Sequence, residues 1–358
     1  MQIGVFDPDT SGHHAEYNAN LADYLRSRGN TVTMIGGELA QRHSTIWLWT
    51  RLMRTVWSWH KFDVVHLTYA DPLPVPLSMI LLVKRLLCPN VDVFITVHWY
   101  TSVVSTNKHS VYRSMKKKCF VFNARRVSGI FVHGNVTKYH LGLLSSAVEQ
   151  RLILIPYGAP GPVKSSLEKR EEPLSLSVLF FGGLRRDKGI EVLAQALREM
   201  SLPIKLIIAG RPIDYTIEEI ESLVQGLDVE LNLKHIPDGL VSDFFVRAKT
   251  LVLPYRSSFG GQSGPLTIAA SHGIPIVGTD VGEVGDTIRS YGLGEVADAD
   301  DEESLKSALI RVLTYSGEEL DRIRTNAMNY SNTHSWSVMS NLICESYINE
   351  PSRIASEI

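Results

Sequence analysis

The sequence predicts an α/β protein of two doubly wound, Rossmann-like domains that face a central cleft. Near-continuous apolar strand segments alternate with helical patterns from end to end, which is typical of parallel sheets covered by helices on both faces. A length of 358 residues suits two domains of ordinary size. Between the two sets of strands, segment 157–173 is rich in Gly, Pro and charged residues, which indicates an interdomain linker.

Apolar runs bounded by turn residues predict the strands of each domain. Those of the first half are Ile3–Phe6, Thr31–Ile35, Val64–Leu67, Val93–Val97, Gly129–Val132 and Leu152–Ile155. Those of the second half are Ser177–Phe181, Ile204–Ala209, Val229–Ile236, Thr250–Pro254 and Ile274–Gly278. We expect an N-terminal domain over residues 1–160 and a second domain over residues 174–335. In such sheets ligands bind beyond the carboxyl ends of the strands, so the turns that follow strands are where a site is expected.

Helix signals support the same organisation. Ser316 stands three residues before Glu319, the spacing of a capping box. The acidic run 300–303 precedes the helical segment 304–313, where carboxylates favour the positive end of the helix dipole. From Trp336 onward apolar residues recur at helical spacing, and we expect a helix over 336–350 that packs back on the N-terminal domain.

The composition is that of a soluble globular protein, with 44% apolar and 21% charged residues. Cys88, Cys119 and Cys344 lie far apart and fit neither a disulfide framework nor a metal motif, so we expect a reducing cytoplasm. The first seven residues are typical of a strand and not of a signal peptide. No apolar run reaches the roughly 18 residues that span a bilayer.

The net charge of −2 conceals a division along the chain. Through Lys164 there are 18 Lys and Arg against 9 Asp and Glu, and the remainder has 18 against 29. A basic first half attracts anionic lipid, a phosphorylated acceptor or nucleic acid. The acidic second half argues against a protein that coats nucleic acid, so we expect no nucleic-acid partner.

The most informative segment is 178–190, an apolar strand that ends in two glycines and continues into a basic loop. Arg185, Arg186 and Lys188 place positive charge ahead of Gly189, where an amphipathic helix opens. Glycines let a backbone approach a ligand, and a helix start offers unpaired N–H groups, so the combination suits a phosphate or diphosphate. Neither a Walker loop nor a dinucleotide fingerprint is present, and a glycine turn with solvated basic residues is the alternative interpretation.

A second signal is segment 251–277, in which a strand ends at Tyr255 and a polar glycine loop follows. A helix of small residues starts near Ser263–Pro265, and an early proline costs it no hydrogen bond. The N–H groups of Ser263 and Gly264 would then be available to an anion or a sugar hydroxyl. An ordinary strand–turn–helix connection is the alternative.

Two strand ends of the first half also carry polar residues. His98 follows strand 93–97, where it is placed to bind a sugar hydroxyl or move a proton, although a core histidine is the alternative. His66 and His133 are weaker candidates of the same kind. After the first strand, Ser11 and Gly12 form a turn ahead of a helix that starts near His13 or His14. Asp7-x-Asp9 is interpreted as a turn and cap pair in preference to a divalent-metal site.

Together these motifs resemble family 4 glycosyltransferases of the GT-B fold. The specific matches are Phe181–Ile190, Ile207–Gly210, His235–Asp238, Leu253–Tyr255, Gln262–Gly264 and Gly273–Gly282. Looser matches are Ile155–Gly158, His98, Ser11–Gly12 and Leu21–Gly29. The resemblance spans nearly the whole chain and is more specific in the second half.

The resemblance implies a hexosyltransferase-type enzyme (EC 2.4) that moves a sugar, with retention, from a nucleotide-sugar donor to a glycan or lipid-linked acceptor. The second domain would bind the donor and the first the acceptor. Implied catalytic residues are His98, facing the donor sugar, and Lys188, contacting the diphosphate, with Arg185 in place of the arginine usually found at position 183. Implied donor-binding residues are Ser11, Gly12, His13, Gly183, Gly210, Ile236, Gln262, Ser263, Gly264 and Pro265. No cofactor is implied, and the cations make a metal unnecessary.

One departure from the family concerns its usual pair of glutamates, which have seven residues between them. Gly260 and Ile268 stand at those positions, and the Gln262-Ser-Gly264 loop resembles a variant that lacks the pair. Ribose binding by a carboxylate on that helix is therefore in doubt. Two alternatives stay open for the function, namely a catalytically silent relative that binds nucleotide or glycan, and a nucleotide-sugar epimerase.

Segment 43–61 holds four of the six tryptophans, interleaved with Arg51, Arg54 and Lys61. Such a composition suits an interfacial helix, and residues 113–118 add a second basic cluster. We expect a cytoplasmic protein that docks peripherally on an anionic inner membrane surface through Trp47, Trp49 and these basic residues. A core helix with a solvated charged face is the alternative.

Overall fold

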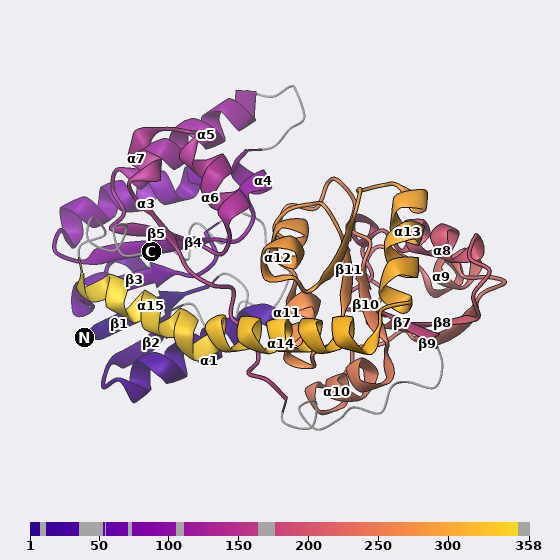
Figure 1. Ribbon diagram of the computed structural model, residues 1–358. Coiled ribbons are helices and arrows are strands. Elements are labelled where there is room, and N and C mark those ends of the chain that lie inside the picture. Colours follow the sequence, from indigo (N-terminus) through magenta and orange to yellow (C-terminus); the bar gives the residue numbers. More distant parts are fainter. Residues whose placement is uncertain are drawn as a thin grey trace. The chain divides into compact units, whose positions relative to one another are not determined.

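The computed structural model describes residues 1–7, 12–35, 53, 55–70, 74–104, 111–163 and 176–349 (Figure 1). They form two compact units. The N-terminal unit comprises Met1–Gly158 together with the segment that begins at Trp336, and the C-terminal unit comprises Ala159–Ser335. Of the expected linker 157–173, residues 164–173 lie outside the described part of the chain.

The sheet of the N-terminal unit has six parallel strands in the order β2-β1-β3-β4-β5-β6. They are β1 (Gln2–Phe6), β2 (Thr31–Ile35), β3 (Val64–Leu67), β4 (Asp92–Val97), β5 (Gly129–Val132) and β6 (Leu152–Leu154). The order reverses direction between β1 and β3. In a doubly wound sheet this reversal creates a crevice beyond the carboxyl ends of the two strands.

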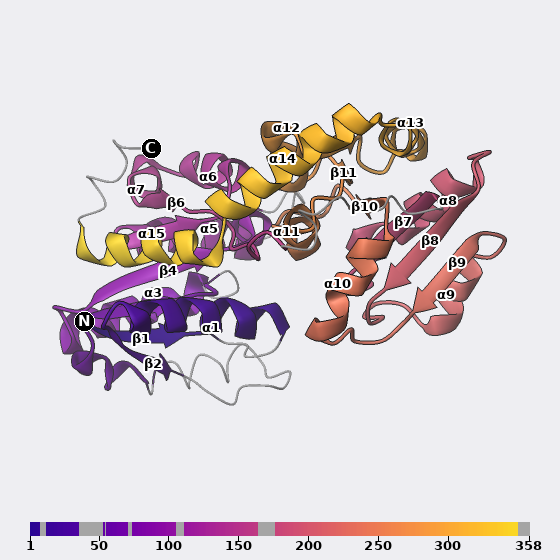
Figure 2. The same ribbon diagram turned by 60° about the horizontal axis from the view of Figure 1, so that its bottom comes forward.

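Alternate residues of these strands face opposite helix layers. On one face, Phe94 and Phe131 pack with α1 (Gly12–Ser27) and α15 (Trp336–Ile348). Figures 1 and 2 show α1 and α15 side by side, and Tyr24 Oη donates to Asn341 Oδ1 over 2.9 Å between them.

The other face of the sheet packs against the remaining described helices of this unit. These are η1 (Trp59–Lys61), α3 (Pro74–Leu87), α4 (Tyr100–Val103), α5 (Val111–Ala124), α6 (Asn135–Gly142) and α7 (Ser146–Glu149).

The sheet of the C-terminal unit also has six parallel strands, in the order β12-β11-β10-β7-β8-β9. They are β7 (Leu176–Phe181), β8 (Ile204–Ala209), β9 (Asp228–Asn232), β10 (Thr250–Leu253), β11 (Ile276–Thr279) and β12 (Gly294–Ala297). Here the order reverses between β7 and β10, which pair directly with each other. The loops that follow these two strands are therefore the expected ligand-binding loops.

Helices again cover both faces. One layer, with η3 (Arg186–Lys188) leading into it, is formed by α8 (Ile190–Arg198), α9 (Ile217–Leu223) and α13 (Glu302–Leu313). The other is formed by α10 (Asp238–Arg247), α11 (Gly264–Ser271), α12 (Val284–Tyr291) and α14 (Gly317–Thr333). The capping box of Ser316 and Glu319 opens α14, and Asp301 caps α13, as the sequence indicated.

The predicted α/β class with two doubly wound sheets is confirmed. Two strand predictions need correction. Strand β12 was missed, and β9 ends at Asn232 instead of Ile236, because the chain turns there and the N–H of Lys234 donates to the carbonyl of Asn232 over 3.0 Å.

Candidate functional site

The loop after β7 is held against its neighbours by glycines that no other residue could replace without strain. Gly182 and Gly210 have φ angles of 109° and 152°, in the region that favours glycine. A Cβ atom at position 210 would lie 1.9 Å from the carbonyl oxygen of Gly182. The ends of β7 and β8 therefore approach each other backbone to backbone.

Gly189 performs the same function on the other side of this loop. It caps α8 in the left-handed conformation, with φ 67°, and a Cβ atom there would lie 1.9 Å from the carbonyl oxygen of Pro254. The N–H of Arg256 also donates to the carbonyl of Asp187 over 3.0 Å. These contacts hold the basic loop after β7 against the chain that follows β10, at the reversal in strand order.

Lys188 is the chemically distinctive residue of this region. Its ammonium lies 3.6 Å from the centroid of the Tyr255 ring and 4.5 Å from that of Phe259. Within the described part of the chain, no carboxylate lies at ion-pair distance from it. Burial lowers the pKa of Lys188 well below its usual range, the charge of Arg185 lowers it further, and Asp187 opposes both. A desolvated cation held by aromatic faces is suited to receive an anion.

The two arginines of the loop differ from Lys188 in having carboxylate partners. Arg185 donates to Asp187 through two hydrogen bonds of 2.9 and 2.7 Å. Arg186 is exposed and pairs with Glu219 at 3.0 Å. Arg185 thus adds positive potential beside Lys188, whereas the charge of Arg186 is engaged elsewhere.

The second expected loop leads into α11, which begins at Gly264 with Pro265 in its first turn. Ser263 is buried, and its hydroxyl shares a hydrogen bond of 2.9 Å with the hydroxyl of Tyr255. No backbone acceptor among the described residues pairs with the N–H groups of Ser263 and Gly264. The same tyrosine therefore contacts both Lys188 and the start of α11, which brings two of the expected donor-binding features together.

The other residues of this unit that were expected to bind the donor lie in or near these loops. Gln262 is partly buried and precedes Ser263, while Gly183 follows the end of β7. The side chain of Ile236 lies in the hydrophobic core with Phe244 and Phe245. A nucleotide base at this loop would meet backbone or the exposed His235 instead of the isoleucine side chain. At the positions of the missing glutamates, Gly260 and Ile268 are buried and partly buried.

In the N-terminal unit, polar residues gather at the carboxyl ends of β1 and β3. The carboxylate of Asp7 lies 3.0 Å from Nδ1 of His14, and accepts hydrogen bonds from Asn18 over 2.7 Å and from Thr68 over 3.3 Å. The turn-and-cap role expected of Asp7 and Asp9 stays a prediction, because residues 8–11 lie outside the described part of the chain. The pairing with His14 was not anticipated. The sequence signal for this pair was that Asp7 and His14 flank the turn between the first strand and the first helix.

His98 stands at the end of β4, as predicted, and belongs to an aromatic cluster. Its Nε2 donates to the carbonyl of Thr68 over 2.9 Å, and its ring stacks on Tyr69 at 4.5 Å. Tyr69 in turn lies 3.9 Å from the ring of His14. Both histidines therefore contact the same tyrosine at the carboxyl edge of the sheet.

His66 is a core residue. Its ring bonds Tyr347 Oη at 2.7 Å and Thr96 Oγ1 at 2.8 Å, and burial lowers its pKa to about 3. Burial likewise lowers the pKa of His133 to about 4, against the opposing effect of its hydrogen bond to the carbonyl of Pro156. Both are neutral at physiological pH.

Of the expected residues of the first turn, Ser11 lies outside the described part of the chain. Gly12 and His13 form the first turn of α1, which begins slightly earlier than predicted, and the side chain of His13 is not described.

Comparisons with known proteins agree with this geometry. Residues 175–315 match the family model "Glycosyl transferases group 1", which covers both loops of the C-terminal site. An uncharacterized glycosyltransferase of Methanocaldococcus jannaschii is 26% identical over 281 residues, or 76% of this chain and 72% of the relative. The chain has the GT-B fold, and its C-terminal unit matches a glycosyltransferase family.

Solved structures share the fold of this chain across both units. Sucrose-phosphate synthase from Thermosynechococcus elongatus has a TM-score of 0.75 at 18% identity, with 97% of this chain and 98% of that chain covered. HepE of Anabaena, solved with UDP-glucose, has a TM-score of 0.73 at 15% identity, with coverages of 97% and 99%.

Segment 43–61, for which membrane contact was predicted, is described in part. Trp47, Trp49, Arg51 and Arg54 lie outside the described residues. Trp59 is buried in the core, while Trp57 is exposed. A search of the described helices finds none that is long and apolar enough to cross a membrane.

Proposed function

We propose that this protein is a glycosyltransferase that takes a sugar, in particular a hexose, from a nucleotide-sugar donor and transfers it with retention to a glycan or lipid-linked acceptor. The observation that carries the donor assignment is the Lys188 ammonium, desolvated over Tyr255 and Phe259, beside the start of α11. HepE, which shares the fold, was solved with UDP and with UDP-glucose, which supports a nucleotide-sugar ligand here.

The chemistry requires stabilisation of a leaving group more than proton transfer by the protein. Cleavage of the bond between the sugar C1 and the diphosphate oxygen places negative charge on the nucleoside diphosphate. Lys188, Arg185 and the N–H groups at Ser263 and Gly264 would stabilise that charge. In our proposal these groups neutralise the diphosphate without a metal ion.

Retention follows if the acceptor oxygen attacks C1 from the face that the diphosphate leaves. The new bond joins the acceptor oxygen to C1, and the hydroxyl proton passes to the departing phosphate oxygen. No protein nucleophile is then needed. We propose that His98 binds the donor sugar and that His14, oriented by Asp7, contacts the acceptor hydroxyl.

The first test is a thermal-shift screen with UDP-, GDP- and ADP-sugars, because a ligand that binds the folded state raises the melting temperature. The stabilising donor is then incubated with and without acceptor, and the anomeric configuration of the product is determined by NMR. An inverted product would overturn retention, and the absence of stabilisation by every donor would overturn the donor site.

Gly260 and Ile268 stand where the family usually has glutamates, and this departure favours a second candidate function, that of a catalytically silent protein that binds nucleotide. It predicts donor binding with neither transfer nor donor hydrolysis. The third alternative, an epimerase, would convert the donor to its epimer without acceptor. The same incubations therefore separate all three.

A further inference from the structure

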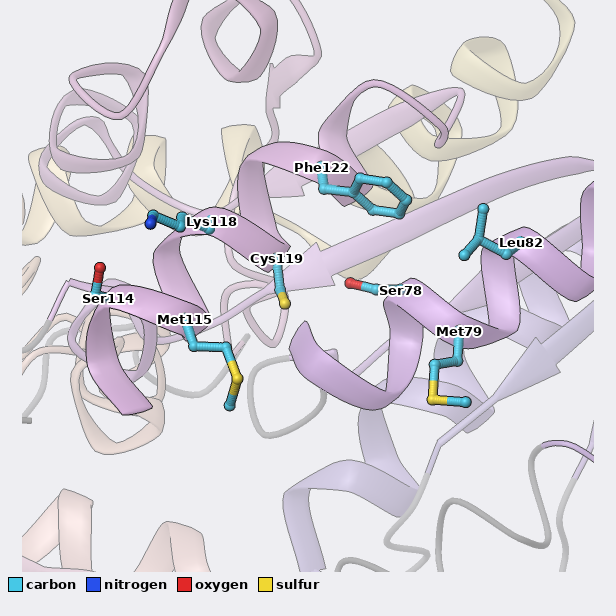
Figure 3. Close-up of a pocket in the computed structure, with 8 residues that line it drawn as sticks. All are labelled: Ser78, Met79, Leu82, Ser114, Met115, Lys118, Cys119 and Phe122. Carbon is cyan, nitrogen blue, oxygen red and sulfur yellow. The ribbon is translucent and has the colours of Figure 1, made fainter. Parts of the chain in front are cut away.

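An apolar groove runs between α3 and α5 of the N-terminal unit. Its volume is about 570 Å³, and it is lined mainly by Met79, Leu82, Met115 and Phe122. Figure 3 shows Ser78 and Cys119 pointing toward each other from the two helices, while Lys118 points away from the apolar lining.

The apolar side chains of this α3–α5 groove are unusually exposed. Met79, Leu82 and Leu86 follow one helical stripe of α3 and are 52%, 45% and 82% exposed. Met115, across the groove on α5, is 41% exposed. Contiguous exposed apolar side chains of this kind mark a surface that is covered by a partner in use.

The charge around the groove indicates the chemistry of that partner. Helix α3 carries two basic residues and α5 carries four, and neither helix contains an Asp or Glu. Just beyond α5, the guanidinium of Arg126 lies 3.4 Å from the centroid of the Phe122 ring. Positive charge around an apolar groove complements a partner that has anionic groups beside hydrocarbon, and it repels a second copy of the same face.

We propose that the α3–α5 face docks on an anionic bilayer and that one lipid acyl chain enters the groove. The lysines of α5 would contact the headgroup region, while Met79, Leu82 and Met115 would exchange water for hydrocarbon. This inference rests on the proposed function in one respect: membrane docking would bring the enzyme to a lipid-linked acceptor.

Sedimentation with large vesicles tests the proposal on the full chain. The wild type should bind vesicles of phosphatidylcholine mixed with phosphatidylglycerol, and bind phosphatidylcholine alone much more weakly. Met79→Ser, Leu82→Ser and Met115→Ser combined should abolish measurable binding, because each side chain that enters hydrocarbon contributes about tenfold. Leu240→Ser, an exposed apolar residue of the C-terminal unit, is the matched control and should bind as the wild type does.

A second arm tests the charges. Lys117→Ala with Lys118→Ala should weaken binding to the mixed vesicles roughly 25-fold, since each basic residue near an anionic surface contributes about fivefold. Arg322→Ala with Arg324→Ala, on α14, removes the same charge from the C-terminal unit and should leave binding unchanged.

Wild-type binding that is absent, or insensitive to both groove variants, overturns the proposal. So does a dimer in sedimentation velocity that the apolar variant dissociates, because the groove would then hold a second copy. Donor binding and donor hydrolysis by the groove variants are measured in parallel without membranes and should equal wild type. A failure of the proposed function would affect those assays and leave vesicle binding intact.

Discussion

The ammonium of Lys188 lies 3.6 Å from the centroid of the Tyr255 ring, and the hydroxyl of the same tyrosine bonds Ser263 at 2.9 Å. One aromatic residue thus links the cation of the loop after β7 to the start of α11. Both loops follow the strands at which the sheet order reverses. This relationship makes Lys188 the residue through which donor binding is best tested.

Removal of the Lys188 charge should weaken donor binding with little loss of stability. Lys188→Ala deletes a charge-assisted contact to the diphosphate, which is worth about 1.5–3 kcal/mol, or roughly ten- to a hundredfold in Kd. Isothermal titration calorimetry with the donor found in the screen measures the change. Arg186→Ala is the matched control, because its guanidinium is exposed and pairs with Glu219. An equal loss in both variants would assign the effect to general charge and not to Lys188.

Donor affinity should also depend on pH through Lys188. Burial holds the pKa of the free lysine below its usual range, and a bound diphosphate favours the charged form and raises that pKa. Affinity should therefore be constant below the free-state pKa and fall by up to about tenfold per pH unit above it. The fall should begin well below about pH 10.4, where an ordinary lysine titrates. Lys188→Arg, which stays charged, should bind without this dependence, and parallel profiles of the two proteins would contradict the assignment.

The backbone at Gly189 should tolerate no side chain. Gly189→Ala places a Cβ atom 1.9 Å from the carbonyl oxygen of Pro254 at a φ of 67°, so the loop must move. We expect a loss of more than about 2 kcal/mol in stability and loss of donor binding. Gly239→Ala is the control, since no atom lies within 4 Å of its Cβ position, and it should change stability by less than about 0.5 kcal/mol. Calorimetric melting of both variants, with and without donor, provides the comparison.

Much of the C-terminal site was predictable because its signals are local in sequence. Gly189 and Gly210 mark the close backbone approaches around the basic loop, and a proline beside Gly264 marks the start of α11. Local signals fail where an element is defined by its neighbours. Strand β12 has only the short segment Gly-Glu-Val-Ala, and Gly294 is required because a Cβ atom there would lie 2.0 Å from the carbonyl oxygen of Ile276.

Side-chain partnerships across the fold were the least predictable part. Tyr255 and Phe259 come from a loop some seventy residues after Lys188, and sequence spacing does not indicate that they cover it. The contacts of Tyr69 with both His14 and His98 likewise depend on the strand order. The direction of the Arg185 side chain was also not predictable. Its ion pair with Asp187 must be kept or broken when Arg185 contacts the donor diphosphate, as proposed.

Asp7 and His14 should affect turnover more than donor binding. His14→Gln keeps a polar side chain of similar length but removes the imidazole that Asp7 orients. If it contacts the acceptor hydroxyl, we expect kcat to fall about 10- to 100-fold, which corresponds to about 1.4–2.7 kcal/mol, with donor Kd unchanged. Asn20→Ala, at a partly exposed polar residue of the same helix, serves as the control. Unchanged kcat in His14→Gln would restrict the Asp7–His14 pair to a structural role.

The buried histidines should make the N-terminal unit sensitive to acid. The pKa of His66 is about 3 and that of His133 about 4 in the folded chain, both below the ordinary value of about 6.5. The unfolded chain therefore binds more protons below about pH 6.5, and the free energy of unfolding should fall toward pH 4 by up to about 1.4 kcal/mol per pH unit for each histidine. Because all six tryptophans belong to this unit, tryptophan fluorescence during urea unfolding follows it selectively.

His66→Gln separates this effect from general acid lability. The variant loses hydrogen bonds to Tyr347 and Thr96, so it should be less stable near pH 7.5 by about 1–3 kcal/mol. Its stability should nevertheless fall less steeply with acid, because one titrating group has been removed. His60→Gln, an exposed histidine of the same unit, should keep the wild-type slope. A slope in His66→Gln equal to that of the wild type would show that protonation of His66 does not drive acid unfolding.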